Sequence, residues 1–300
     1  MESREFIKSL TAPQRILFTK RSDVRGLLHL GGHAGLILLI GALIALKGPG
    51  WPLLMLPQGI LIIFLFTALH ESIHRTAFRS LWLNKGVAKL CGLLVLLPPE
   101  WFRYFHIEHH RFTQDPLRDP ELRSPKPETV GQYIWHICGI PIWISHAKTL
   151  LRNALGRIDD AFVPMHGRAA VTREARLMLL TYAGLAALSV AFGSALLLYV
   201  WILPALIGQP FLRLYLLAEH GLCPENAESA DSFTNTRTTL TNPLMRKLAW
   251  NMPFHAEHHA FPAVPFHALE RLHMLTRPHL KETEAGYLSF HRKYLRRLAR

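Results

Sequence analysis

The sequence has little charge for its length. Only 18% of its 300 residues are charged, whereas half are apolar. This balance disfavours an ordinary soluble domain and favours a membrane protein. The charge that is present is mostly positive, with 34 Lys and Arg against 21 Asp and Glu, but no basic stripe with interleaved aromatic residues occurs. We therefore expect membrane lipids as partners of the basic surface and no nucleic acid.

Cysteine is also scarce. Cys91, Cys138 and Cys223 are widely spaced and form no CxxC pair, which excludes a disulfide framework and a thiolate metal site. The first residues are charged and lack the apolar core of a cleaved signal peptide, so none is expected. Residues 6–18 instead mix apolar side chains with cations, a pattern typical of a segment that lies in the membrane interface.

Long apolar runs are the most prominent feature of the sequence. They cover residues 27–46, 52–69, 177–193 and 195–217. Each is close to the roughly 20 residues that a helix needs to cross a bilayer, so the sequence predicts four transmembrane helices in two hairpins. Pro204, Gly208 and Pro210 predict a bent or interrupted fourth span.

Positive charges predict the orientation of these spans. Lys and Arg concentrate in residues 1–26, 70–175 and 213–300, whereas the connector 47–51 carries only Lys47. Because such cations stay on the cytoplasmic side, both termini are expected there. The expected fold is an all-α membrane protein of one domain, 1–300, whose cytoplasmic helical cap is formed by residues 70–175 and 218–300 and holds a histidine-rich dimetal site.

Half of the 18 histidines fall in short, regularly spaced groups. They are His70 and His74 in HESIH, His106, His109 and His110 in HIEHH, His220 in AEHG, and His255, His258 and His259 in HAEHH. Because residues i, i+3 and i+4 share one face of a helix, each HxxHH group is expected to present three imidazoles to one point. Nine nitrogen ligands exceed the needs of one ion, so two metals are predicted. Imidazole alone does not select among Zn, Cu, Fe and Ni.

The order HxxxH, HxxHH, HxxHH resembles the integral-membrane fatty acid desaturase and hydroxylase superfamily. The flanking stretches HHRFTQDPLRDPEL and TRTTLTNPLMRKLAWNMPFHAEHHAFPAVPFHAL are similar to bacterial members, so an inner-membrane location is expected. The resemblance implies two iron ions that use O2 and two external electrons to remove hydrogen from an unactivated C–H bond. It implies as ligands His70, His74, His106, His109, His110, His255, His258 and His259, with His220 as the ninth.

The reaction and its partners follow from the same resemblance. Desaturation of a fatty acid or acyl lipid is favoured, and hydroxylation of a lipid or smaller amphiphile is the alternative that the sequence leaves open. Electrons would come from an external donor such as an acidic ferredoxin or rubredoxin, attracted by the basic cytoplasmic face.

Two other functions compete with this interpretation. HESIH matches the HExxH signature of zinc proteases, but a protease would leave HIEHH and HAEHH without a purpose. A metal transporter or sensor would place ionisable residues deep in several spans, whereas most of the predicted spans here lack such residues. His29 and His33 are the exceptions, and the glycines beside them favour a helix contact.

Several polar residues are candidates for contacts with the ligand histidines. Glu71 is expected either beside a ligand or facing solvent. Asp115 and Asp119 repeat an Asp-Pro dipeptide that is typical of turns, and a hydrogen bond to a ligand imidazole is compatible with that role. Asn251 either caps the helix that carries HAEHH, with Pro253 in its first turn, or lies near the metals. Glu108 and Glu257 are expected at the surface or behind the ligands, because each lies on the opposite side of its helix from the first histidine of its box.

Overall fold

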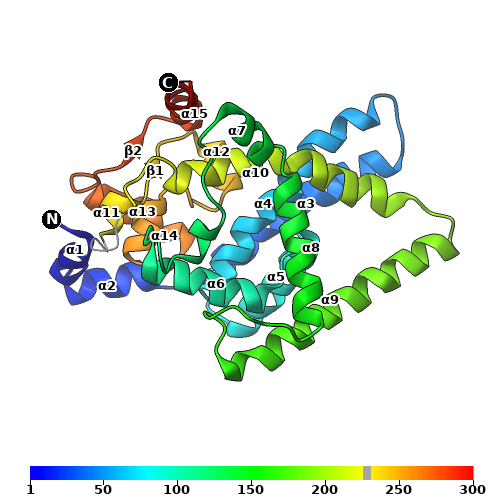
Figure 1. Ribbon diagram of the computed structural model, residues 1–300, viewed down its shortest axis with the longest axis horizontal. Helices are drawn as coiled ribbons and strands as arrows, with labels where there is room; N and C mark the ends of the chain where they lie inside the picture. The colour runs from blue at the N-terminus through cyan, green and yellow to red at the C-terminus, as the bar shows by residue number, and fades with distance from the viewer. Residues whose placement is uncertain (226–230, 300) are drawn as a thin grey trace.

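The computed structural model describes residues 1–225 and 231–299, and most of these residues are helical (Figure 1). The elements up to the first histidine group are α1 (Ser3–Ser9), α2 (Ala12–Thr19), α3 (Asp23–Ala45), η1 (Trp51–Leu54) and α4 (Met55–Ile73). The central elements are α5 (Leu81–Leu94), α6 (Pro99–Phe112), η2 (Pro120–Arg123), α7 (Val130–Ile137), α8 (Ile140–Ala154) and α9 (Met165–Ala191). The last elements are η3 (Leu198–Ile202), α10 (Leu203–His220), α11 (Ser232–Asn235), β1 (Thr238–Thr239), α12 (Pro243–Leu248), α13 (His255–Ala260), α14 (Phe266–Thr276), β2 (Thr283–Glu284) and α15 (Tyr287–Leu298).

Four helical segments are long and apolar enough to cross a membrane. They are Ala12–Ala45, Trp51–Ile73, Met165–Ala191 and Leu198–His220. Each overlaps most of one predicted apolar run, but the boundaries differ. The third segment begins at Met165 rather than at residue 177, because its first turns pack against α6 and α8, with Val171 and Ala175 fully buried.

The fourth span is irregular, as predicted, but only in its first turns. The π-helix η3 lies just before Pro204 within the continuous helical segment Leu198–His220. Pro204 has no N–H to offer the Val200 carbonyl oxygen, and this oxygen accepts a hydrogen bond from the Gln58 side chain at 3.0 Å. α10 continues through Gly208 and Pro210 without a break, so no interruption occurs at those two residues.

The helices that carry the site are held together by a close glycine contact. α10 lies along α4, and a Cβ built on Gly59 would be 1.9 Å from the Pro204 carbonyl oxygen. A Cβ on Gly208 would be 2.3 Å from the Gly59 oxygen. The two backbones thus touch, as small residues allow in membrane helices. α9 diverges from α10 beyond their turn and packs against α8 instead (Figure 1).

α5 and α6 form a sharply bent pair, with an angle of 101° between them. Pro98 and Pro99 follow the break. A proline disfavours a helical conformation in the residue before it and cannot donate a backbone hydrogen bond. The chain therefore does not continue α5 through these residues, and α6 begins as a separate helix. The bend turns α6 across the end of α4, which places the histidines of HIEHH opposite those of HESIH.

The N-terminal helices are partly buried rather than wholly interfacial. Phe6, Leu10 and Phe18 belong to the main hydrophobic core, while Ile16 and Leu17 are exposed. Phe6 packs edge-on against Phe233, with ring centroids 5.9 Å apart. The expectation of an interfacial segment overlooked that α1 and α2 cover the C-terminal helices, which gather on the same side of the molecule (Figure 1).

We predict that Gly208→Ala destabilises the protein. Alanine normally favours a helix over glycine by up to ~1 kcal/mol, but here its methyl group meets backbone atoms that cannot move aside. Overpacking of this kind costs about 1–3 kcal/mol. Thermal unfolding of the purified protein in detergent measures the effect. The control is Gly184→Ala on α9, where no described atom lies within 4 Å of the added Cβ; equal unfolding temperatures for the two variants would contradict the prediction.

Candidate metal centre

The structure brings all nine spaced histidines to one place. Each group comes from a helix or a helix end. His70 lies in the last turn of α4 with His74 directly after it, and His220 ends α10. The other six belong to α6 and α13. All nine are buried or half-buried, and they form two groups that touch.

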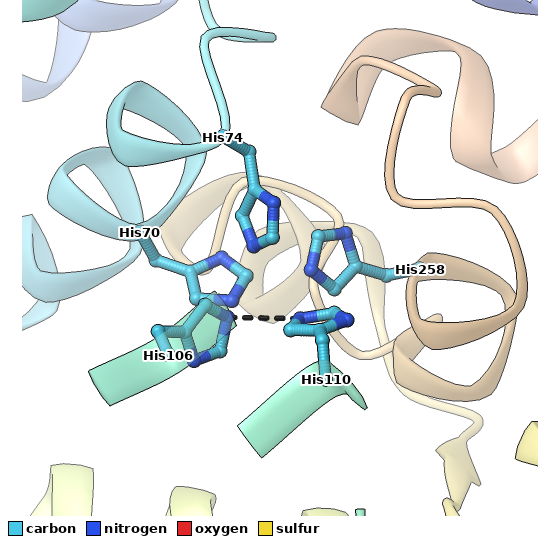
Figure 2. Close-up of side chains that lie close together, drawn as sticks. All are labelled: His70, His74, His106, His110 and His258. Atoms are coloured by element: carbon cyan, nitrogen blue, oxygen red, sulfur yellow. Dashed lines mark hydrogen bonds between the residues drawn. The ribbon is translucent and has the colours of Figure 1, made fainter. Parts of the chain in front are cut away.

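The first is the five-histidine group. It consists of His70, His74, His106, His110 and His258, each offering one ring nitrogen within 4.8 Å of the others. Figure 2 shows these rings converging from α4, α6 and α13. The Nε2 atoms of His106 and His110 are 2.9 Å apart.

The second is the four-histidine group, which consists of His109, His220, His255 and His259. The Nε2 atom of His220 lies 3.2 Å from that of His109 and 3.1 Å from that of His255. His259 lies within the same cluster as His109 and His220. His110 stacks on His259 with ring centroids 3.9 Å apart, so the two groups are in contact.

Each HxxHH box is divided between the two groups, contrary to the expectation that its three imidazoles meet at one point. On α6, His106 and His110 enter the five-histidine group and His109 enters the other. Residues i and i+4 are only about 40° apart around a helix, whereas i+3 lies about 60° to the opposite side of i. α13 divides in the same way, since His258 and His259 point into different groups.

Most of the buried imidazoles are neutral. His109 is the exception, because the carboxylates of Glu121 and Asp119 outweigh the effect of burial and raise its pKa to about 9. Burial lowers the pKa of His74 to about 3, and burial together with neighbouring imidazoles lowers the pKa of His258 and His259 well below the ordinary value. Several of their nitrogens are buried without a hydrogen-bond partner among the described residues, including both nitrogens of His70 and of His258. Neutral, unpartnered ring nitrogens are the form of histidine that binds metal.

The spacing of the nitrogens fits metal coordination. Bonds of about 2.1 Å to imidazole at right angles would separate two nitrogens by about 3.0 Å. The three closest Nε2 pairs, at 2.9, 3.1 and 3.2 Å, match this value. Imidazole suits several transition metals, so the residues present can hold a pair of such ions.

Outer partners fix the rings of the four-histidine group. His109 donates from Nδ1 to Asp119 at 2.9 Å, and the same nitrogen lies 3.1 Å from Glu121. His259 donates from Nδ1 to Thr113, whose hydroxyl itself donates to the His109 carbonyl oxygen.

The third ring is placed in the same way, because His220 donates from Nδ1 to the Asn235 carbonyl oxygen at 3.3 Å. His255 differs: its Nδ1 lies 3.4 Å from a Glu219 oxygen but makes no hydrogen bond among the described residues. In His109, His220 and His259 the Nδ1 atom donates to an oxygen, so Nε2 is left for a metal, an arrangement typical of metal-binding histidines.

Sequence reasoning named one of these partners, Asp119, and missed the others. Glu219 carries only a weak signal, its adjacency to His220. Asp115, the other Asp-Pro candidate, does not reach a ligand and instead accepts hydrogen bonds from the Leu117 and Arg118 backbone and from the Arg118 side chain. Its carboxylate shapes the turn, and the turn delivers Asp119 to His109.

Glu71 is fully buried rather than facing solvent. One carboxylate oxygen accepts from the Thr76 hydroxyl and the Phe266 N–H, and the other lies 4.0 Å from His258 Nδ1. Held in this way, Glu71 supports the site from behind. The structure thus assigns HESIH to the five-histidine group and gives its glutamate no open position of the kind that the general base of a zinc protease needs.

Asn251 is neither a helix cap nor close to the histidine nitrogens. Its side chain donates to the Phe266 carbonyl oxygen at 3.0 Å, and its backbone has a φ of 57°. α13 begins at His255 with Phe254 as its N-cap, so Pro253 precedes the first turn rather than forming part of it. Asn251 therefore shapes the turn before the third box.

The glutamates inside the two HxxHH boxes differ. Glu108 is half-buried, whereas Glu257 is fully buried and accepts hydrogen bonds from Thr238, His273 and Thr276. His273 lacked any informative spacing in the sequence, yet it is buried against this carboxylate. Glu257 thus anchors α13 to β1 and α14 on the side away from the metal site.

His29 and His33 serve packing, as predicted, but through polar contacts. His29 bonds the Lys247 carbonyl oxygen and His33 bonds the Leu61 carbonyl oxygen, each at 2.8 Å. They connect α3 to α4 and to α12.

Four candidate membrane helices and a buried, histidine-rich cluster able to hold metal define the class of the protein. Residues 48–291 match the family model described as fatty acid desaturase. The chain therefore belongs to the fatty acid desaturase family, which points to an oxidoreductase, and the resemblance seen in the sequence is confirmed. No curated protein sequence matches the chain.

We predict that Asp119→Asn weakens Fe²⁺ binding about 10–100-fold, the usual effect of losing a partner behind a ligand histidine. The amide no longer holds the His109 Nδ1 proton as the carboxylate does. Equilibrium titration of the metal-free protein with Fe²⁺ against a competing chelator measures the change. Asp159→Asn is the matched control, because it makes the same substitution at an exposed carboxylate outside the two histidine groups. Equal affinities of the two variants would sink the assigned role of Asp119.

Proposed function

We propose that the protein is an O2-dependent di-iron membrane oxidoreductase that desaturates the acyl chain of a fatty acid or lipid. The convergence of nine buried ring nitrogens into two touching groups carries this proposal. The five-histidine group would hold one ion and the four-histidine group the other. Bound iron, supplied with O2 and two electrons, provides the oxidant that such a reaction needs.

The protein itself would position the ions and exclude water. The oxygens that accept from the Nδ1 atoms of His109, His220 and His259 hold those rings in place. Aromatic residues close the site on the side of α4 and α6, where Phe102 stacks on His106 at 5.4 Å and Phe66 lies 6.3 Å from His70. A site closed in this way protects a reactive oxidant from bulk solvent.

Hydroxylation remains the alternative outcome of the same hydrogen removal. The two outcomes differ in whether a second hydrogen leaves the neighbouring carbon or oxygen enters the first. Desaturation is favoured by the description of the matching family. An external donor such as an acidic ferredoxin or rubredoxin would supply the electrons at the basic face.

The same proposal includes the arrangement in the membrane. The chain would form one domain, 1–300, with two pairs of spans crossing a bacterial inner membrane and both termini in the cytoplasm. The cations of residues 1–26 and 70–175, and the nearly uncharged turns at 46–50 and 192–196, support this orientation. The metal site would then lie just beneath the cytoplasmic surface.

We predict that His258→Ala abolishes iron-dependent activity, whereas His166→Ala does not. His258 is fully buried in the five-histidine group, and His166 is exposed near the start of α9. Cells that express each variant are compared by O2-dependent lipid profiling and by the iron content of the purified protein. A new double bond identifies a desaturase and a new hydroxyl group a hydroxylase. Wild-type product levels from His258→Ala would refute the site assignment.

We predict opposite accessibility for the two ends of the spans. A cysteine at Gly48, in the turn before α4, should react with a membrane-impermeant maleimide in intact spheroplasts. A cysteine at Arg296 on α15 should react only after lysis. Both positions are exposed, so burial does not limit labelling, and the three native cysteines are first replaced by serine. The reverse pattern would contradict the proposed orientation.

A further inference from the structure

A second cluster of polar side chains lies where the turn between α7 and α8 meets α10. It consists of His136, Trp143, His146, Gln209 and Arg213, named here the Arg213 cluster. Gly139 forms the turn with a φ of 77°, and a Cβ there would be 2.5 Å from Gln209 Cγ. The turn therefore rests directly on α10. Arg213 follows Gln209 by four residues and occupies the same face of that helix.

One polar atom of each side chain in this cluster lacks a partner in the described part of the chain. His136 Nε2, Trp143 Nε1, His146 Nδ1, Gln209 Oε1 and Arg213 Nε are all buried without a hydrogen bond among the described residues. Gln209 is only 2% exposed. Five such atoms in one cluster are unusual, because buried polar groups are ordinarily paired. Their pattern indicates a missing polar ligand.

Arg213 supplies an uncompensated positive charge within a candidate span. No carboxylate of the described residues lies within ion-pair distance of it; Glu121 and Glu219 act on it only from farther away. Both of those carboxylates lie beside histidines of the metal site, Glu121 at 3.1 Å from His109 and Glu219 at 3.4 Å from His255. An ionisable residue at such a depth ordinarily serves a functional site.

The neighbouring histidines add no positive charge to that of Arg213. Burial and the Arg213 guanidinium lower the pKa of His136 and of His146 to about 4, so both rings are neutral. The cluster thus combines one cation with neutral groups, the Trp143 N–H among them. Four of its members are half-buried, so a ligand can reach them without opening the core.

We propose that the Arg213 cluster binds the anionic head group, a carboxylate or a phosphate, of an amphiphilic substrate. This inference rests on the proposed function, because the chain of that substrate would run from the cluster towards the metal site. A guanidinium binds such oxygens through paired, charge-assisted hydrogen bonds. Arg213 precedes His220 by seven residues, about 10 Å along the helix axis. The reacting carbon would accordingly lie several bonds from the head group.

Binding of matched single-chain ligands tests the proposal independently of catalysis. Hexadecanoate, hexadecyl phosphate and hexadecanol are titrated into the purified, iron-loaded protein in detergent, with affinity read from calorimetry. Arg213→Gln should weaken binding of at least one anion about tenfold or more and leave hexadecanol unchanged. The anion that the wild type binds more tightly identifies the head group. Arg296→Gln, an exposed arginine on α15, is the matched control and should bind all three ligands as the wild type does.

Two further variants distinguish the loss of a ligand contact from a folding defect. Arg213→Lys keeps the positive charge but lacks the planar guanidinium, and it should lose less affinity for the anion than Arg213→Gln. Trp143→Phe removes the indole N–H together with part of the ring but keeps an aromatic side chain, and should weaken anion binding by a smaller factor. Equal anion affinity in Arg213→Gln and wild type, or equal loss of hexadecanol and anion binding, would overturn the proposal. A protein that binds the anion through Arg213 but forms no O2-dependent product would contradict the proposed function alone.

Discussion

The burial of nine imidazoles at the meeting point of α4, α6, α10 and α13 is the constraint on which the rest of the structure depends. Burying polar ring nitrogens without partners costs free energy, and several of those nitrogens have no partner among the described residues. Coordination of metal would offset part of that cost by giving one nitrogen of each ring a bond. The backbone contact between Gly59 and Gly208 serves the same end, because it fixes α4 and α10 at the separation where His70 and His220 reach the two groups.

The two histidine groups differ in how firmly they are held. In the four-histidine group the Nδ1 atoms of His109, His259 and His220 donate to oxygens of Asp119, Thr113 and Asn235. In the five-histidine group both nitrogens of His70 and of His258 lack such partners. Support for this group comes instead from the buried carboxylates of Glu71 and Glu257, which position the backbone around it. The more firmly held group is also the one at the end of α10, the helix that carries Arg213.

Much of the site could be predicted because its information is local. The spacing within HESIH, HIEHH and HAEHH is set by helix geometry, and the apolar runs mark the spans without any knowledge of packing. Other features depend on contacts between distant segments. Asp119 rather than Asp115 reaches His109 because Asp115 first closes a turn. The division of each HxxHH box between the two groups becomes apparent only when α6 and α13 face each other. Pro210 remains within a helix because α4 supports α10 on one side.

The metal content of the purified protein tests the central claim most directly. Elemental analysis of protein reconstituted with Fe²⁺ under anaerobic conditions, and freed of loosely bound metal, should give two iron ions per chain. A single ion per chain, or none, would contradict a centre built from two histidine groups.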